Sequence, residues 1–424
     1  MTLPVVNRYD EVKTKKLRVI KVKDGKNFKK QARRMVLDVP KEDFMRYLVR
    51  SKSVLDCRSK IQSIESSGSL KMNIQLIDTK FTIPASTLAL LDYYRIFDEI
   101  QQYKNEKSYF NISIDRNKLK PILETDGWYE LIIPEKQLEI DSIRKIEYAT
   151  DYAIMALKSY MDKFYKFEQE RWEAPLLEFQ EISATDNNFV DEYTFTVTPQ
   201  NSLDTTGEEL DKFIGDIKSI LADNNGLNEY EKKFDFNKNL CLFDFRSHLY
   251  APLVCLKKGN TNIQITPVSL NEDEKLFVDY LKEFTENNGD VLENKSLYLL
   301  RNKSKVGMGF FVAGNFYPDY ILWIDTPEKQ YITFVDPKGL LRIMPDDPKI
   351  EFYKTIKDLE KQLAPTAGDK QIVLNSFIMS ATKSADLHEW WHWDKTTREA
   401  HNVYTLDDDQ CVISMINKIC FLQS

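Results

Sequence analysis

Apolar and aromatic residues in the last third of the chain predict a β-hairpin over residues 316–339. Two runs rich in aromatic and β-branched side chains flank a short polar connection, Thr326 to Lys329. Such runs joined by a short loop are typical of paired antiparallel strands. A turn centred between residues 327 and 328 would pair the two runs residue by residue.

Three charged residues are expected to converge at the open end of this hairpin. In that register Asp319 lies opposite Asp336, and Lys338 points to the same face, because residues two apart on a strand share a face. Two opposed carboxylates repel each other, and a cation between them would relieve the repulsion. A register shifted by one residue would separate the three side chains and leave scattered charges on a solvated hairpin.

The strongest helix prediction covers residues 143–173, where apolar residues recur at three- and four-residue spacing until Pro175 ends the pattern. Further helices are expected at 41–50, 86–102, 208–222, 272–284 and 348–363. Strands are expected at 17–23, 72–83, 193–197, 297–303, 307–312 and 371–380. The first 140 residues therefore read as mixed α and β, and the whole chain as α/β.

The chain of 424 residues is too long for one ordinary core, so two or three domains are expected. Turn-rich stretches at 182–189 and 199–207 place a boundary near residue 180. We expect a mixed α+β part over 1–180, ending in the long helix, a small β-rich connecting region over 181–265, and a third domain over 266–424.

The composition, 42% hydrophobic and 29% charged, is typical of a soluble globular protein. The sequence shows no leading charged-then-apolar signal and no apolar run long enough to span a bilayer, so we expect a cytoplasmic protein without a membrane partner. The five cysteines form no CxxC pair. Reduced, buried thiols are therefore expected rather than a zinc site or a disulfide framework.

Charge is distributed unevenly along the chain. The net charge is −7, yet residues 1–60 hold 18 Lys and Arg against 7 Asp and Glu, a local balance of +11. The densest basic part runs from Lys13 to Lys23. It could contact phosphates, or it could form a solvated face, since no aromatic residues alternate with the charges for base stacking.

The oxygen ligands of the hairpin suit a hard cation, Mg²⁺ or Mn²⁺. Such an ion needs few protein carboxylates, here Asp319 and Asp336, and completes its shell with water and substrate phosphate. It can polarise a phosphodiester and lower the pKa of an attacking water. Lys338 would then orient that water or stabilise the developing negative charge.

The same residues carry a resemblance to a known family. Pro318-Asp319 followed by Asp336-Pro337-Lys338 on the next strand resembles the PD-(D/E)xK nuclease signature. The longer sequence around this motif, residues 316–323 and 334–339, resembles the endonuclease domain at the C-terminal end of type III restriction enzyme Res subunits. The resemblance covers roughly residues 145–400. It implies a restriction-endonuclease-like α/β/α core near the C-terminus and a DNA substrate.

The resemblance extends to three further segments. The helix at 143–173 is similar to the long helix that follows the helicase core in Res subunits, and residues 240–256 are similar to the segment that leads into the nuclease domain. His248 lies in that segment and could be either a packed residue or a base. The resemblance also implies a third acidic residue, Glu274, at the metal site. Asn271 and Glu274 equally form a capping-box pattern, which gives Glu274 a purely structural alternative.

This sequence departs from the family in three respects. The second acidic position is Asp336 rather than the commoner Glu, and Pro337 removes a backbone donor, which is tolerated at a strand edge or end. No GxxxxGK[ST] phosphate-binding loop is present, so the chain carries no visible ATP motor. We expect either a C-terminal fragment or a subunit that works beside a separate helicase/ATPase or modification subunit.

A rival motif lies further on. His388-Glu389-Trp390-Trp391-His392 satisfies HExxH, which on a helix presents two zinc ligands and a base. His401 or Asp394 could supply a third ligand, but the glycine of the metzincin pattern is absent. The tryptophans at 390, 391 and 393 could instead form a packed aromatic cluster or contact a partner or nucleic acid.

Three hypotheses follow. The first is a Mg²⁺- or Mn²⁺-dependent DNA endonuclease of restriction or anti-phage type, in which Asp319, Asp336 and Glu274 bind metal and Lys338 assists the water. The second is a non-catalytic adaptor that keeps the nuclease fold and binds DNA or a helicase. The third is a zinc peptidase built on His388 and His392.

Overall fold

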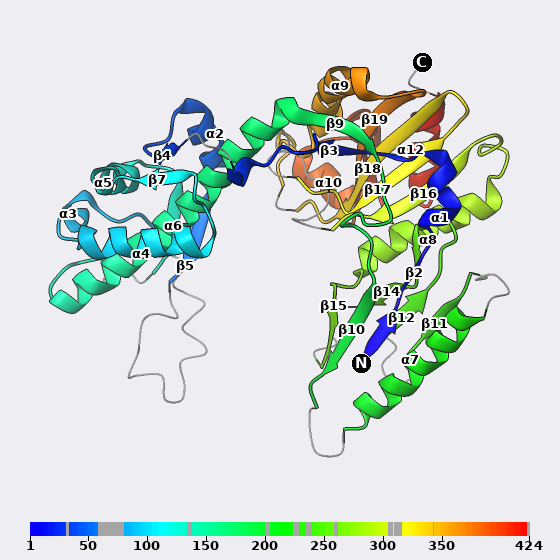
Figure 1. Cartoon of the computed structure of the whole chain (residues 1–424), viewed down its shortest axis with the longest axis horizontal. Coiled ribbons are helices and arrows are strands. Elements are labelled where there is room, and N and C mark those ends of the chain that lie inside the picture. The colour runs from blue at the N-terminus through cyan, green and yellow to red at the C-terminus, as the bar shows by residue number, and fades with distance from the viewer. Residues whose placement is uncertain are drawn as a thin grey trace. The chain divides into compact units, whose positions relative to one another are not determined.

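A computed structural model gives the fold of most of the chain. It describes residues 1–30, 34–57, 80–133, 138–199, 204–223, 229–234, 240–257, 262–303, 308, 316–341 and 343–421. The strand expected at 72–83 lies outside the described residues up to residue 79, and the strand expected at 307–312 lies outside them except for Met308. The structure is mixed α/β, as the sequence predicts (Figure 1).

The chain forms two compact units. One is Val22–Leu176, and the other combines Met1–Lys21 with Leu177–Ser424. Leu177 lies close to the boundary predicted at residue 180. Residues 181–265, expected to be a separate connecting region, fall in the same unit as 266–424, and so do the first 21 residues.

The unit Val22–Leu176 contains helices and two small sheets. Its helices are α2 (Glu42–Arg50), α3 (Ala85–Leu88), α4 (Tyr93–Glu106), α5 (Arg116–Glu124) and α6 (Ile143–Glu173), with 3₁₀ turns η2 (Phe28–Lys30) and η7 (Ala174–Leu176). Strand β4 (Met35–Leu37) pairs in parallel with β7 (Ile112–Ile114). Strand β8 (Tyr129–Ile132) lies between β5 (Ser53–Asp56) and β6 (Lys80–Phe81).

Helix α6 has the limits that its apolar periodicity predicts, 143–173. Within its apolar stripe, Ala153, Leu157 and Tyr160 are fully buried, whereas Phe164 is half-buried. The helix expected at 86–102 is instead two helices, α3 and α4. The break occurs because the Asp92 carboxylate accepts hydrogen bonds from the backbone of Tyr94 and Arg95, which starts a new helix there.

A five-stranded sheet is the centre of the other unit. Its order is β16 (Ser296–Arg301), β17 (Tyr320–Asp325), β18 (Lys329–Lys338), β19 (Gln371–Ser380) and β20 (Val403–Thr405). Strand β17 runs antiparallel to both β16 and β18, whereas β19 runs parallel to β18 and to β20. In chain order, a helix precedes three antiparallel strands, and a second helix then leads to the parallel strand.

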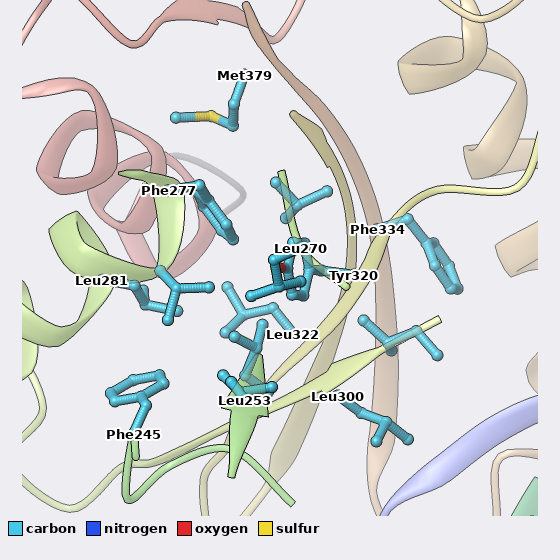
Figure 2. Packing of buried hydrophobic residues seen from close by; sticks show 14 of the residues in the cluster. Phe245, Leu253, Leu270, Phe277, Leu281, Leu300, Tyr320, Leu322, Phe334 and Met379 are labelled. Carbon is cyan, nitrogen blue, oxygen red and sulfur yellow. The ribbon is translucent and has the colours of Figure 1, made fainter. Parts of the chain in front are cut away.

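Both faces of this sheet are covered, which explains why β17 is buried at every position. On one face, Phe277 and Leu281 of α8 (Glu272–Asn287) pack towards Tyr320 and Leu322, as Figure 2 shows. On the other face, the Trp323 indole donates to the backbone oxygen of Arg18 in β3, 2.8 Å away. Strand β3 therefore covers the middle of that second face.

Helix α9 (Phe352–Leu363) protects the edge that β19 exposes before it meets β20. The Glu360 carboxylate accepts from the backbone N–H of Leu374 at 2.6 Å, and Lys357 Nζ donates to the Leu374 oxygen at the same distance. These contacts satisfy backbone groups that an uncovered edge strand would leave open.

The remaining elements of this unit surround the sheet and form smaller ones. The helices are α1 (Tyr9–Val12), η1 (Lys13–Lys15), α7 (Thr206–Ala222), η8 (Ala364–Thr366), α10 (Ser384–Trp391), α11 (Lys395–Ala400) and α12 (Cys411–Phe421). The smaller sheets are β1 (Thr2–Pro4) with β10 (Glu192–Val197) and β15 (Ile263–Thr266); β11 (Glu231–Lys233) with β12 (Leu240–Phe243) and β14 (Leu253–Leu256); β2 (Val6–Asn7) with β13 (Tyr250–Ala251); and β3 (Arg18–Val22) with β9 (Leu177–Glu181).

A buried ion pair holds the N-terminal segment in this unit. Arg8 Nη2 lies 2.7 Å from Asp244 Oδ2, and both side chains are almost completely buried. The Arg8 guanidinium also donates to the backbone oxygens of Phe245 and His248, at 3.1 and 3.2 Å. Because the paired groups are far apart in sequence, no local pattern predicts this contact.

The cysteine prediction is confirmed: all five thiols are free, and all but the half-buried Cys420 are buried. Among the described helices, none combines the length and the apolar composition needed to cross a membrane.

Candidate active site at the open end of the hairpin

The predicted hairpin register is confirmed. Strands β17 and β18 pair from Tyr320 opposite Val335 to Asp325 opposite Gln330. The turn is closed by Thr326, whose backbone N–H donates to the oxygen of Lys329 at 2.9 Å. Extending this register by one residue beyond Tyr320 puts Asp319 opposite Asp336, as the sequence predicts.

The carboxyl groups of Asp319 and Asp336 are in contact, joined by a side-chain hydrogen bond. Asp336 is 3% exposed and Asp319 is half-buried. Burial, the neighbouring carboxylates of Asp336 and Glu274, and this hydrogen bond raise the pKa of Asp319 to about 9, against the weaker opposite effect of Lys338. The Asp319 carboxyl therefore keeps its proton near neutral pH.

Lys338 completes the predicted cluster. Its ammonium group forms an ion pair with Asp336, two residues earlier on the same strand. It also lies 4.8 Å from the centre of the buried Phe316 ring, a cation–π contact. Pro337 between them lies near the end of β18, beyond the last residue paired with β17, which suits the missing backbone donor.

Glu274 has the structural role that its sequence position suggested, and it also lies near the acidic pair. It closes the capping box of α8, in which its carboxylate accepts from the Asn271 backbone at 2.9 Å. The same Oε2 atom lies 3.2 Å from the guanidinium of Arg301 on β16. Its charge nevertheless acts on Asp319. The cap and a place beside the acidic pair are therefore compatible in one side chain.

Asn302 positions Asp319 and was not singled out from the sequence. Its backbone N–H donates to the oxygen of Asp319 at 2.7 Å, and its buried side-chain amide donates to the oxygens of Pro318 and Met308 at 2.8 and 2.7 Å. It thereby fixes the segment just before β17. A lone Asn after a strand gives no sequence signal for this role.

Lys349 is a second basic residue beside the cluster that the sequence analysis missed. Burial and the charge of Lys338 lower its pKa, whereas Asp347 and Asp336 act in the opposite direction. It lies in the connection between β18 and α9, and its backbone N–H donates to Asp347 Oδ1 at 2.9 Å. Lys349 is remote from Lys338 and Asp336 in sequence, so the sequence gives no sign that their charges interact.

His248 is a packed residue, which was one of the two predicted possibilities. It is fully buried, and burial lowers the pKa of its imidazole to about 3, so the ring is neutral. Its Nε2 accepts from the backbone N–H of Arg301 at 3.1 Å, and its Nδ1 lies 2.9 Å from the oxygen of Tyr250. A proton on Nδ1 satisfies both contacts. His248 therefore links the segment before β13 to β16.

The HExxH segment does not form the geometry that a zincin needs. Helix α10 ends at Trp391, and His392 follows with a left-handed backbone, φ +56°, so the two histidines do not share a helix face. His388 Nδ1 lies 3.1 Å from the oxygen of Trp393, and His401 Nδ1 lies 2.8 Å from that of Thr397. His388 and His401 thus each have a local backbone partner.

Two of the three nearby tryptophans pack, as one of the alternatives predicted. Trp391 is buried and donates through its indole to the oxygen of Ile343 at 2.9 Å. Trp393 packs edge-on against Trp391, with ring centres 5.2 Å apart. Trp390 is 56% exposed and does not share this burial.

The donor set of the acidic pair suits a hard divalent cation. All of its donor atoms are carboxylate oxygens. Burial is the largest cause of the raised pKa of Asp319, and the charges of Asp336 and Glu274 come second; bound Mg²⁺ or Mn²⁺ would offset this charge repulsion. Asp319 and Asp336 would hold such an ion. Within the part of the chain that the structure describes, no three His, Cys, Asp or Glu side chains form a ready-made metal cluster.

Comparison with protein-family models, with curated proteins and with solved structures finds no match for this chain.

Proposed function

We propose that this chain is a metal-dependent DNA endonuclease that hydrolyses phosphodiester bonds. The observation that carries the proposal is the meeting of Asp319, Asp336 and Lys338 at one end of a buried hairpin. Two acids and a lysine in this order on adjacent strands are what the PD-(D/E)xK resemblance implies for a nuclease site. A helix, three antiparallel strands, a helix and a parallel strand around them also suit the α/β/α core of that resemblance.

Each residue has a role that follows from its position. Asp319 and Asp336 hold the cation, and Asn302 fixes the backbone of Asp319. Bound Mg²⁺ or Mn²⁺ would supply the Lewis acidity that polarises the phosphodiester and activates water. Lys338, held between Asp336 and the Phe316 ring, orients the water or stabilises the developing negative charge. Glu274 adds a third negative charge to the cluster.

The biological setting follows from the resemblance alone. A restriction or anti-phage role is proposed because the family that the sequence resembles acts in DNA restriction. An ATP-driven helicase, either a separate subunit or a part missing from this sequence, or a modification subunit is proposed as the partner, because the sequence shows no phosphate-binding loop.

One observation favours a second function, the non-catalytic adaptor. Glu274 is engaged by Arg301 and by its own helix cap, and the described residues contain no ready-made cluster of three metal ligands. Cleavage of supercoiled plasmid with Mg²⁺ or Mn²⁺, compared with EDTA, separates the two functions. The nuclease requires metal-dependent nicking that Asp336→Ala loses, whereas the adaptor binds DNA and never cuts it.

A further inference from the structure

A pocket at the turn end of the β17–β18 hairpin collects positively charged side chains. It has a volume of about 340 Å³. Four cationic residues from three segments line it: Lys15 and Lys16 around the end of η1, Arg18 at the start of β3, and Lys370 just before β19. Two carboxylates also line it, so its formal charge is positive. The basic run noted in the sequence therefore contributes to a concave site.

Lys370 already forms an ion pair with Asp325, the more buried of the two acidic residues in the pocket. Asp325 is 4% exposed, and its Oδ1 accepts from Lys370 Nζ at 2.6 Å and from the Gln330 side-chain amide at 3.1 Å. Lys370 also donates to the backbone oxygen of Thr326 at 2.7 Å. The Lys370–Asp325 ion pair therefore holds both side chains in place, and their opposite charges cancel at this part of the pocket.

Lys15 and Lys16 are less firmly held. Lys15 Nζ is 4.0 Å from Asp325 Oδ2, and its side chain is 40% exposed. Lys16 Nζ is 3.9 Å from Asp369 Oδ2, and the Asp369 side chain is 91% exposed. The Lys16–Asp369 pair is exposed on both sides and contributes little. Lys15 Nζ also donates to Ser296 Oγ at 3.3 Å, and its second partner Asp325 is buried. The Lys16 ammonium can therefore exchange its partner for an anion, and the partly exposed Lys15 ammonium can contact the same anion.

The Arg18 guanidinium lies against a glycine at the pocket. Gly368 has φ +81°, and a Cβ added there would lie 2.6 Å from Arg18 Nη2. The glycine thus lets the guanidinium lie against the backbone before β19. The Arg18 backbone N–H donates to Gln330 Oε1 at 2.7 Å, and its guanidinium lies 3.5 Å from Glu181 Oε1. Arg18 is therefore a positioned cation rather than a freely moving one.

We propose that this pocket binds a phosphate group, and that Lys15, Lys16 and Arg18 are the cations that recognise it. A converging set of ammonium and guanidinium groups is the chemistry that recognises phosphate. A nucleic-acid strand and a free phosphate compound both present this group. Asp319 and Asp325 share one face of β17, about 20 Å apart at the usual rise per strand residue. If the proposed nuclease function holds, the pocket contacts the DNA backbone away from the cut.

The test measures binding by the full chain in EDTA, so that no cleavage is needed. The probes are a fluorescein-labelled 20-nucleotide strand and the same sequence as a duplex, titrated at several salt concentrations, with pyrophosphate and ATP as competitors. The double variant Lys15→Gln/Lys16→Gln removes two pocket charges. The matched control is Lys354→Gln/Lys361→Gln, which removes two exposed, ion-paired lysines from α9 of the same unit.

The pocket variant should bind the labelled strand about tenfold more weakly at low salt. The slope of log affinity against log salt concentration should fall by about 1, the value for one lost phosphate contact. The affinity of the control variant should stay within about twofold of wild type. Asp369→Asn removes an exposed negative charge and should tighten binding, an effect opposite in sign to any damage to the fold. Competition by pyrophosphate or ATP as effective as that of the strand would identify a free phosphate compound as the ligand. Weak competition would identify the strand.

Equal effects of the pocket and control variants, or weaker binding by Asp369→Asn, would overturn the proposal. Because these readouts need neither metal nor Asp336, they remain decisive even if the chain never cuts DNA.

Discussion

Asp319 and Asp336 face each other across the open end of the β17–β18 hairpin, and a hydrogen bond joins their carboxyl groups. Burial and the neighbouring carboxylates raise the pKa of Asp319 to about 9, so this carboxyl keeps its proton near neutral pH. A fold that keeps two acids in this position must bind either a proton or another cation there. The proposed metal site and the pH dependence of stability both follow from this contact.

Replacing Asp319 with Asn should change how stability depends on pH. The pKa of Asp319 in the folded protein is raised to about 9 from its ordinary value of 3.8, so the native state holds a proton that the unfolded state releases between these values. The wild-type free energy of unfolding should therefore fall as pH rises from about 4 to about 9. The variant lacks this contribution and should gain on the order of 1–3 kcal/mol over wild type between pH 5 and pH 9.

Urea unfolding of both proteins at pH 5, 7 and 9 without divalent metal measures this difference. Asp358→Asn, at an exposed position of α9, is the control and should show no such trend. A difference between Asp319→Asn and wild type that is the same at every pH would contradict the raised pKa of Asp319.

Asn302→Ala should lower cleavage more than its cost in stability explains. The variant loses side-chain hydrogen bonds to Pro318 and Met308, a cost of about 1–3 kcal/mol, and releases the backbone before Asp319. Asn111→Ala removes a buried side-chain hydrogen bond, 2.9 Å to the oxygen of Phe28, and is the control. At a temperature where both variants are folded, plasmid cleavage should fall in the first and persist in the second. Equal cleavage would remove the positioning role of Asn302.

Glu274→Gln separates the two roles proposed for that residue. Gln at this position of a capping box still accepts the Asn271 N–H, so the helix cap survives. The negative charge near Asp319 is lost. If Glu274 supports the metal site, the Mg²⁺ concentration needed for half-maximal cleavage should rise at least about tenfold, within the range seen for outer-shell changes at metal sites. An unchanged Mg²⁺ requirement would leave Glu274 with the cap and the Arg301 pair alone.

The purified protein should contain no stoichiometric zinc at the HExxH segment. His392 lies past the end of α10 in a left-handed conformation, and His388 and His401 already contact backbone oxygens. Elemental analysis after purification without chelator checks this expectation. One zinc per chain, lost in His388→Ala, would restore the peptidase hypothesis.

The parts of the fold that the sequence predicted are those fixed by local pattern. The limits of α6 follow from a long apolar periodicity. The alignment of Asp319 with Asp336 follows from a short turn that sets the register of the whole hairpin. Strand β19 matches its predicted range, 371–380, because six of its ten residues are apolar and lie close together. In each case neighbouring residues carry enough information to determine the structure.

The parts that could not be predicted depend on contacts between distant segments. The buried pair of Arg8 with Asp244 joins the N-terminus to a segment more than 200 residues away. Asn302 hydrogen-bonds the backbone of Asp319, and the charge of Lys349 interacts with that of Asp336. In both cases the partners lie on different segments, so no local sequence pattern predicts the interaction. The site was therefore predictable on its two paired strands, and its supporting residues were not.

The most direct test of the central claim is cleavage of supercoiled plasmid by the purified protein with Mg²⁺, Mn²⁺ or EDTA. Wild type is compared with Asp336→Ala, Lys338→Ala and the control Lys361→Ala, all checked for folding by circular dichroism. The account predicts metal-dependent nicking by wild type and the control, and at least a hundredfold loss in both site variants, on the order of what removing a charge-stabilising group costs. Metal-dependent cleavage by Asp336→Ala at the wild-type rate would contradict the account.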